Sequence, residues 1–373
     1  MPGMSQARIA IFIPSFGDGG VERMLVNLAN GFVQAGAAVS FVLKRRDGVY
    51  LDRLLPEVGL IVFHDADDTS LIQEMIAFLR EARPAVVLSA KERDDRIALE
   101  VKSRLGDDAP RFFLRAGTSV LSREQTRKPY AFKRWFHRRA LKKLCARCDG
   151  ILANSEGVAR ELADYAGISP ERIHIVPNPT VTPDIEILSR ASVDHPWFAP
   201  AQPPVILGVG RLSRAKDFPT LIQAFAELRK RRTCRLVILG EGGQRPSLEA
   251  LAARLGVAED VELLGFVKNP FAFLARAALF ALSSQREGCP NVLIEALAVG
   301  TPVVATDCPS GPREILAGGR YGPLVPVGDS HAMAEAMASV LDNSLPSEVL
   351  QEAAGEYTPE NSSRAYLRAF GLG

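Results

Sequence analysis

Residues Ser283 to Leu316 read SSQREGCPNVLIEALAVGTPVVATDCPSGPREIL, and this stretch decides the fold of the C-terminal half of the chain. Asn291 to Val299 is apolar on nearly every side, which predicts a buried helix that Gly300 ends as a C-terminal cap. Thr301 to Asp307 predicts a buried parallel strand, and Pro309 to Glu314 opens another helix. A buried helix followed by a buried strand predicts a domain of the α/β class.

Two carboxylates stand within this apolar stretch. Glu295 lies inside the predicted helix, and because an isolated buried charge is costly, it must be paired or meet a ligand. Glu287 precedes Gly288 and Pro290, which predict a fixed turn aimed at the helix start. That start presents unpaired amides and the positive end of the helix dipole, which favour phosphate. The alternative is a helix with one ion-paired glutamate.

The spacing of these two glutamates, with seven residues between them in EGCPNVLIEALAVGTPVVATD, resembles the donor-site signature of the retaining family 4 glycosyltransferases, which have the GT-B fold. In that family the first glutamate faces the transferred sugar, the second holds the ribose hydroxyls of the nucleotide, and amides at the helix start bind the diphosphate. The resemblance implies these roles for Glu287, for Glu295, and for the backbone of Asn291, Val292 and Leu293.

A second match follows the predicted strand Val205 to Gly210. The family keeps an Arg and a Lys at this strand end, both directed at the donor diphosphate, and Arg211 and Lys216 match them. A forked guanidinium and a compact ammonium can stabilise a departing nucleotide without metal. The resemblance therefore implies that Glu287, Arg211 and Lys216 are catalytic, with no metal and no other cofactor. Taken alone, the two cations would indicate a solvated loop.

The N-terminus shows a strand, a glycine loop and a helix in succession. Arg8 to Ser15 predicts the strand, FGDGG follows, and apolar residues recur at helical spacing from Val21 to Gln34. Such a loop lets backbone amides approach phosphate or sugar closely, although it is not a GxGxxG fingerprint. It resembles the GGxER element of family 4 enzymes, in which a glycine contacts the donor diphosphate, and this implies that role for Gly19 and Gly20.

A chain of 373 residues exceeds what one core usually holds, so two domains are expected. Strands alternate with helices throughout, which predicts parallel βαβ units and doubly wound sheets. The proline-rich run from 177 to 204 predicts a linker. With the resemblance, we expect two Rossmann-like domains facing a cleft: residues 1–190, completed by a C-terminal helix in 357–373 that crosses back, and residues 201–356 as the nucleotide-sugar-binding domain.

Composition excludes several classes of protein. The N-terminus shows no export signal and the apolar runs are strand-sized, so we expect a cytoplasmic protein without a transmembrane span. The five cysteines include one close pair, Cys145 and Cys148, with no second pair to complete a zinc site, which predicts buried thiols.

The net charge of +2 hides a basic segment, which we define as Arg111 to Arg147: twelve Lys and Arg residues against one acidic residue, Glu124. Aromatic residues lie among its cations in RKPYAFKRWFHRRALKKLCAR, which predicts a surface for an anionic lipid or a lipid diphosphate acceptor, on the inner face of the cytoplasmic membrane. The residues expected at this surface are Lys133, Arg134, Trp135, Arg138 and Arg139. The alternative is a solvated basic helix.

Two further positions concern the site. Asp65, Ala66 and Asp67 form a DxD triplet of the kind that binds metal in another glycosyltransferase fold, but the alternation of strands and helices favours a solvated loop here. Many family 4 enzymes also place a histidine near Ala116 to contact the sugar. This sequence has none there.

The expected function is transfer of a sugar, from a UDP-hexose or UDP-N-acetylhexosamine, to a hydroxyl of a glycan or lipid-linked acceptor, in the synthesis of cell-surface polysaccharide or glycolipid. We expect no nucleic-acid partner. Two other classes stay open: a nucleotide-sugar epimerase of similar two-domain shape, whose acid/base residues cannot be located here, and a non-catalytic partner that binds nucleotide sugar or lipid.

Overall fold

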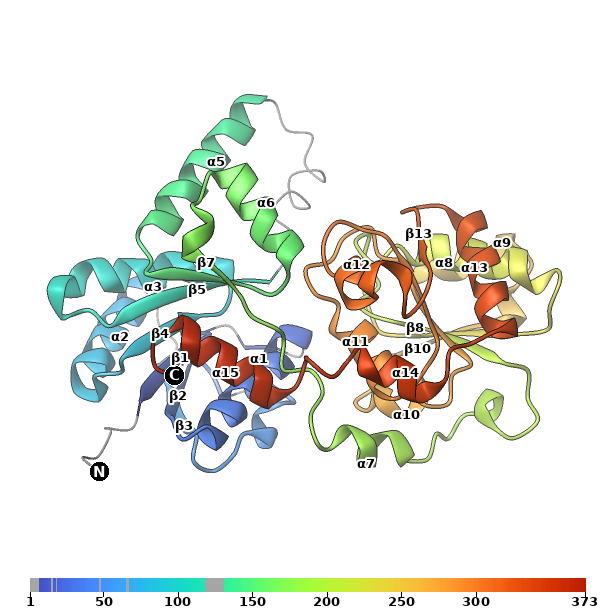
Figure 1. Ribbon diagram of the computed structural model, residues 1–373, viewed down its shortest axis with the longest axis horizontal. Coiled ribbons are helices and arrows are strands. Elements are labelled where there is room, and N and C mark those ends of the chain that lie inside the picture. The colour runs from blue at the N-terminus through green and yellow to red at the C-terminus, as the bar shows by residue number, and fades with distance from the viewer. Residues whose placement is uncertain (1–6, 15, 18, 47, 65–66, 118–130) are drawn as a thin grey trace. The chain divides into compact units, whose positions relative to one another are not determined.

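The computed structural model describes residues 7–14, 16–17, 19–46, 48–64, 67–117 and 131–373, except for the side chains at 92–93 and 131–134. The chain divides into two compact units (Figure 1). The first unit comprises residues 1–180 and 357–373, and the second comprises residues 181–356. The two chain crossings lie side by side, because the amide of Thr180 donates to the carbonyl of Tyr357 at 2.8 Å.

The first unit contains, within its described residues, a seven-stranded parallel sheet in the order β3-β2-β1-β4-β5-β6-β7. Its strands are β1 (Arg8–Phe12), β2 (Ala38–Leu43), β3 (Gly59–Val62), β4 (Val86–Ser89), β5 (Arg111–Ala116), β6 (Gly150–Ala153) and β7 (Ile173–Ile175). Its α-helices are α1 (Gly20–Gln34), α2 (Asp68–Ala82), α3 (Glu92–Leu105), α5 (Ala131–Ala146), α6 (Glu156–Ala166) and α15 (Pro359–Ala369).

The second unit contains a six-stranded parallel sheet in the order β10-β9-β8-β11-β12-β13. Its strands are β8 (Val205–Val209), β9 (Arg235–Leu239), β10 (Val261–Gly265), β11 (Leu279–Leu282), β12 (Val303–Thr306) and β13 (Leu324–Val325). Its α-helices are α7 (Ile185–Arg190), α8 (Phe218–Arg229), α9 (Arg245–Arg254), α10 (Pro270–Leu274), α11 (Asn291–Ala298), α12 (Pro312–Ile315), α13 (Ser330–Asp342) and α14 (Ser347–Glu352). The two parallel sheets confirm the predicted doubly wound α/β class.

The C-terminal helix α15 belongs to the first unit, as the sequence predicts, and lies beside α1 (Figure 1). Phe370 packs on Phe113 of β5 with ring centroids 4.8 Å apart. The two helices come so close that a Cβ atom on Gly31 would lie 2.3 Å from the Oγ of Ser363. Glycine at position 31 is therefore required for this packing.

The run from 177 to 204 is more structured than a linker. It contains α7 and the 3₁₀ turn Pro196–Phe198, and both pack on the second unit. Asn269 donates to the carbonyl of Leu188 at 2.8 Å, and His195 lies 2.9 Å from a carboxylate oxygen of Glu262. In this run the chain passes from the first unit to the second between Thr180 and Val181.

Each sheet has one point at which the strand order reverses. In the first unit this point lies between β1 and β4, and in the second it lies between β8 and β11. Ligands of open parallel α/β sheets bind outside the carboxyl ends of the strands at such a point. The loops that follow β8 and β11, and those that follow β1 and β4, are thus the places to look for a site.

Candidate functional site

Helix α11 carries Glu295 in its buried interior. The residue is 2% exposed, and its helix neighbours Leu293, Ile294 and Leu297 are buried with it. Gly300 ends the helix with a φ of 76°, which confirms the predicted cap. Glu295 takes part in at least one further polar or electrostatic interaction. A carboxylate held so deeply requires a polar partner or a ligand.

The amides at the start of α11 are not equivalent. The N–H of Leu293 donates to the carbonyl of Pro290 at 3.0 Å, so this predicted phosphate donor is already used within the first turn. The N–H of Val292 finds no acceptor among the residues that the structure describes. Val292 is therefore the better candidate for an anion at this helix start.

Lys216 and Glu287 form an ion pair at the strand-order reversal of the second unit. Lys216 follows β8, Glu287 follows β11, and the Lys216 ammonium lies 2.5 Å from the Oε1 of Glu287. The hydroxyl of Ser284 donates to the same oxygen at 2.6 Å. The Glu287 side chain is 13% exposed. The Lys216 side chain is 23% exposed, so the ion pair lies at the margin of the core.

Further hydrogen bonds hold the two loops together. The hydroxyl of Ser283 donates to the carbonyl of Lys216 at 2.8 Å, and the amide of Gln285 donates to the carbonyl of Ala215 at 2.9 Å. Ser310, on the loop after β12, donates to the carbonyl of Glu287 at 3.4 Å. The sequence analysis gave these serines no role. Ser283 and Ser284 directly follow a buried strand, and this position could have indicated that they belong to the site.

Arg211 stands apart from this network. It is exposed, and no hydrogen bond or ion pair joins it to the described residues. Its loop is fixed from the other side by the loop after β9, where a Cβ atom on Gly240 would lie 2.0 Å from the carbonyl of Gly210. Leu212 also donates to the carbonyl of Glu241 at 2.8 Å. A free guanidinium on a fixed loop is suited to binding an anion.

The glycine loop of the first unit is also tied by a lysine and a glutamate. Gly19 caps α1 and Gly20 begins it. The buried carboxylate of Glu22, in the first turn, lies 2.5 Å from the ammonium of Lys91, which follows β4. A Cβ atom on Gly19 would lie 2.8 Å from the Oε2 of Glu22. Lys91 thus neutralises the Glu22 carboxylate beside Gly19 and Gly20, the predicted diphosphate contacts. The sequence analysis did not identify Lys91.

The basic segment forms α5 over its second half. Trp135 and Phe136 are 53% and 50% exposed, and the guanidinium of Arg139 lies over the Trp135 ring, 5.5 Å from its centroid. Arg138 is exposed as well. The side chains of Lys133 and Arg134 lie outside the described residues. The helix packs inward through Leu141, Leu144 and Cys145.

The remaining expectations concern metal and thiols. Asp65 and Ala66 lie outside the described residues, and Asp67 caps α2, where a hydrogen bond from the Ser70 amide lowers the pKa of its carboxyl. The five cysteines are buried thiols, as predicted. Burial raises the pKa of Cys145 and Cys308 to about 12, so both thiols are protonated near neutral pH.

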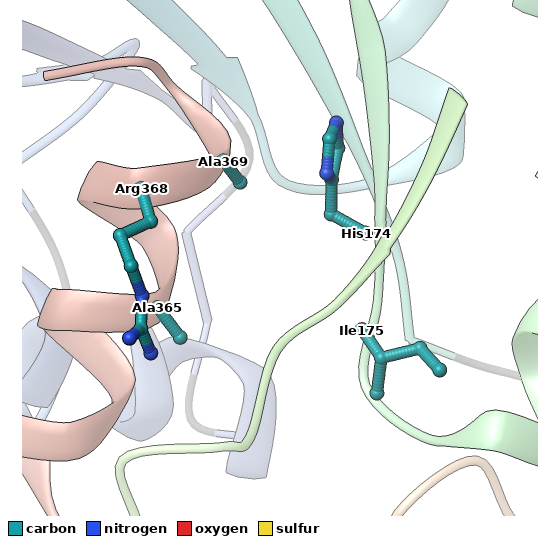
Figure 2. Close-up of a pocket in the computed structure, with 5 residues that line it drawn as sticks. All are labelled: His174, Ile175, Ala365, Arg368 and Ala369. Carbon is teal, nitrogen blue, oxygen red and sulfur yellow. The ribbon is translucent and has the colours of Figure 1, made fainter. Parts of the chain in front are cut away.

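A cavity of about 270 Å³ lies between β7 and α15 in the first unit. Figure 2 shows His174 and Ile175 on one side of it and Ala365, Arg368 and Ala369 on the other. None of the predicted site residues lines it. None of the helices that the structure describes has both the length and the apolar character needed to cross a membrane.

Two family models match this chain and together span most of it. Residues 18–182 match the model described as Glycosyltransferase Family 4, and residues 203–343 match the model described as Glycosyl transferases group 1. These ranges include Gly19 and Gly20 of the glycine loop in the first unit, and Arg211, Lys216, Glu287 and Glu295 in the second.

Named relatives match to different extents. A Campylobacter jejuni N-acetylgalactosamine-N,N'-diacetylbacillosaminyl-diphospho-undecaprenol 4-alpha-N-acetylgalactosaminyltransferase is 36% identical over 200 residues, which cover 54% of this chain and only 53% of that relative. The lipopolysaccharide core biosynthesis glycosyltransferase LpsE of Rhizobium meliloti is 28% identical over 94% of this chain and 95% of its own length.

Among solved structures, Anabaena HepE in complex with UDP and glucose superposes with a TM-score of 0.78 at 19% identity, covering 98% of this chain and 100% of that one. The lipopolysaccharide outer core galactosyltransferase WaaB superposes with a TM-score of 0.70 at 20% identity, covering 98% of each chain. At these identities the likeness concerns the fold, and it confirms the predicted GT-B class.

Proposed function

The chain belongs to glycosyltransferase family 4, and we propose that it transfers a sugar from a nucleotide sugar to an acceptor hydroxyl with retention of configuration at the anomeric carbon. The observation that carries this proposal is the junction of Lys216, Glu287 and Ser284 at the strand-order reversal of the second unit. Open α/β sheets bind nucleotides at such a position. The junction places a cation that can bind phosphate beside a carboxylate that can accept hydrogen bonds from sugar hydroxyls.

The proposed donor is a UDP-hexose or UDP-N-acetylhexosamine, and the proposed acceptor is a glycan or lipid-linked saccharide of cell-surface polysaccharide or glycolipid synthesis. Support for the donor comes from HepE, which was solved with UDP and glucose. Support for the acceptor comes from the names of the relatives, one of which acts on a diphospho-undecaprenol substrate and one in lipopolysaccharide core synthesis.

In the proposed mechanism, placement and charge neutralisation supply the catalysis. As the bond from the anomeric carbon to the diphosphate oxygen breaks, Lys216, Arg211 and the Val292 amide would stabilise the charge that develops on the diphosphate. The acceptor oxygen attacks from the same face, and its proton passes to a diphosphate oxygen. Glu287 would hold the transferred sugar, and Glu295 would hold the ribose hydroxyls. These protein cations would take the place of a metal ion.

The protein is further proposed to work at the inner face of the cytoplasmic membrane, bound peripherally through α5. Exposed indole and phenyl rings beside Arg138 and Arg139 support this, because such rings enter the interface while cations meet anionic headgroups. The same surface would receive a lipid-linked acceptor.

The purified protein, incubated with a panel of UDP-sugars and GDP-sugars and followed by mass spectrometry, tests the proposal. We expect slow release of UDP from one or two donors, and no release by a Glu287→Gln, Lys216→Ala double variant. Conversion of the sugar into its epimer without release of nucleotide would establish the epimerase instead. Binding of a nucleotide sugar with no turnover in the presence of membrane extract would indicate a non-catalytic partner.

A further inference from the structure

The carboxyl ends of β5 and β6 hold two buried polar side chains, each with one polar atom that forms no hydrogen bond to the described residues. Arg115, on β5, is 6% exposed, and Asn154, directly after β6, is 5% exposed. The Nε of Arg115 and the Oδ1 of Asn154 have no hydrogen-bond partner in the part of the chain that the structure describes. Buried polar atoms in proteins are rarely left in this state, so both require an explanation.

The two side chains belong to one cluster around Gly117. A Cβ atom on Gly117 would lie 2.3 Å from the Nη1 of Arg115, so the guanidinium packs directly on this backbone. The Nη2 of Arg115 donates to the Oδ1 of Asn178 at 2.8 Å, and the amide of Asn154 donates to the carbonyl of Gly117 at 3.3 Å. The guanidinium is thus fixed in place, while its Nε donor forms no hydrogen bond with any residue that the structure describes.

The charge of Arg115 is not balanced nearby. Its guanidinium donates to the neutral amide oxygen of Asn178, and no carboxylate among the described residues pairs with it. A buried cation without a counter-ion destabilises a fold, so such an arrangement persists where a ligand uses it. Arginine presents a planar fork of donors that matches phosphate, whereas the free Oδ1 of Asn154 can accept only from a donor such as a hydroxyl.

We propose that Arg115 binds a phosphate group of the acceptor and that Asn154 accepts a hydrogen bond from a sugar hydroxyl beside it. This inference rests on the proposed function and narrows its acceptor to a sugar linked to phosphate or diphosphate. Two observations favour the acceptor over the donor as the source of the phosphate. The cluster belongs to the unit that lacks Arg211, Lys216 and Glu287, and β5 opens the basic segment, whose net charge is +11.

Calorimetric titration with inorganic pyrophosphate tests the site. The full chain is used in a Lys216→Ala background, so that the donor-side contact is weakened equally in every protein. Arg115→Gln should weaken pyrophosphate binding at least tenfold. The matched control is Arg111→Gln, because Arg111 is exposed at the opposite end of the same strand; its affinity should stay within twofold. Equal affinity of the Arg115→Gln and Arg111→Gln proteins would overturn the proposal.

Two further measurements distinguish the remaining explanations. If Arg115 only anchors Asn178, Arg115→Gln should lower the Tm and leave the stabilisation by pyrophosphate unchanged, which overturns the proposal. If Arg115 binds a phosphate ligand, the Tm of Arg115→Gln without ligand should not fall below that of the parent protein, and pyrophosphate should no longer raise it. UDP titration of the otherwise wild-type chain separates the sources of phosphate. Unchanged UDP affinity in Arg115→Gln supports an acceptor phosphate, whereas a tenfold loss overturns that assignment in favour of the donor.

The same titrations separate failure of this site from failure of the proposed function. Wild-type protein that binds no nucleotide sugar and no UDP contradicts the glycosyl transfer proposed above. UDP binding that persists, together with pyrophosphate binding that ignores Arg115, contradicts the acceptor site alone.

Discussion

The ammonium of Lys216 lies 2.5 Å from the carboxylate of Glu287, although 71 positions separate the two residues in the chain. They meet because β8 and β11 are neighbours at the strand-order reversal of their sheet. The other unit repeats the arrangement at its own reversal point, where Lys91 pairs with Glu22. In both units, therefore, one lysine and one glutamate at the reversal point are already fixed and paired before any substrate binds, which reduces the cost of organising them later.

Removal of the Lys216 charge should lower turnover much more than it lowers the stability of the fold. We expect Lys216→Ala to lower turnover by roughly a hundredfold or more, as is typical for loss of one preorganised charge contact to a transition state. Steady-state assay with the donor identified from the panel measures this. Arg214→Ala is the control, because Arg214 is exposed on the same loop, and it should stay within threefold of wild type. A Lys216→Ala enzyme within threefold of wild type would contradict the assignment.

Glu295 should act on nucleotide binding. Loss of a charged hydrogen bond costs about 1.5–3 kcal/mol, so Glu295→Gln should weaken UDP binding by roughly ten- to a hundredfold. Glutamine keeps the shape of the side chain inside α11, so the fold should survive. Titration with UDP tests this, with Glu348→Gln on the neighbouring helix α14 as an exposed control. Equal UDP affinity in the two variants would remove Glu295 from the donor site.

Metal should be dispensable, because Arg211 and Lys216 are proposed to neutralise the diphosphate. Turnover should therefore survive dialysis against EDTA, with less than a twofold change. If chelation abolishes turnover and magnesium or manganese restores it, the proposed mechanism fails. Asp67 and its neighbour Asp65 would then be examined as ligands through the Asp65→Asn and Asp67→Asn variants.

Asp95 should make the stability of the first unit depend on pH. Burial raises the pKa of its carboxyl from 3.8 to about 7, although the Ser89 hydroxyl, which donates to it at 2.6 Å, opposes the shift and Asp94 adds to it. Between pH 4 and 7 the native state holds a proton that the unfolded chain has lost, so stability falls as pH rises through this window. Urea unfolding at pH 5 and pH 8 should show this loss, and Asp95→Asn should reduce it.

Much of the fold could be predicted because the decisive signals are local. The apolar run at α11, with Gly300 after it, marked a buried helix and its end, and the strand predicted from Val205 to Gly210 is observed as Val205–Val209. Buried parallel strands are continuous apolar runs, which makes them readable from sequence. The run from 177 to 204 was predicted as a linker because proline indicates breaks in regular structure. Proline content carries no information on tertiary packing, so the packing of α7 on the second unit was missed.

The chemistry of the site was less accessible to sequence reasoning. The resemblance assigned Lys216 and Glu287 to one site, but it did not predict that the two side chains form an ion pair, which the strand order brings about. The same holds for Lys91 beside Glu22, and for Arg115 beside Asn178, whose separations are 69 and 63 positions. Pairings across neighbouring strand ends depend on topology, which one sequence does not specify.

The exposed face of α5 should bind anionic vesicles. Each cation near such a surface contributes on the order of 1 kcal/mol, and the rings of Trp135 and Phe136 can enter the interface. We expect the protein to co-sediment at low salt with vesicles containing anionic lipid and to be released as salt screens the attraction. Reversal of Lys133, Arg134, Arg138 and Arg139 to Glu should release it while UDP binding persists, because Arg211, Lys216 and Glu295 lie in the other unit.

A charge-matched comparison decides whether this face is specific. Arg138→Glu with Arg139→Glu changes the net charge as much as Arg364→Glu with Arg368→Glu, and all four arginines are exposed in the first unit. The α5 pair should abolish most of the sedimentation, whereas the α15 pair should reduce it little, because α15 carries no exposed aromatic ring. Equal losses of sedimentation in the two double variants would show that net charge alone accounts for vesicle binding. No sedimentation of the wild type at low salt would leave α5 a solvated helix and favour an acceptor free in solution.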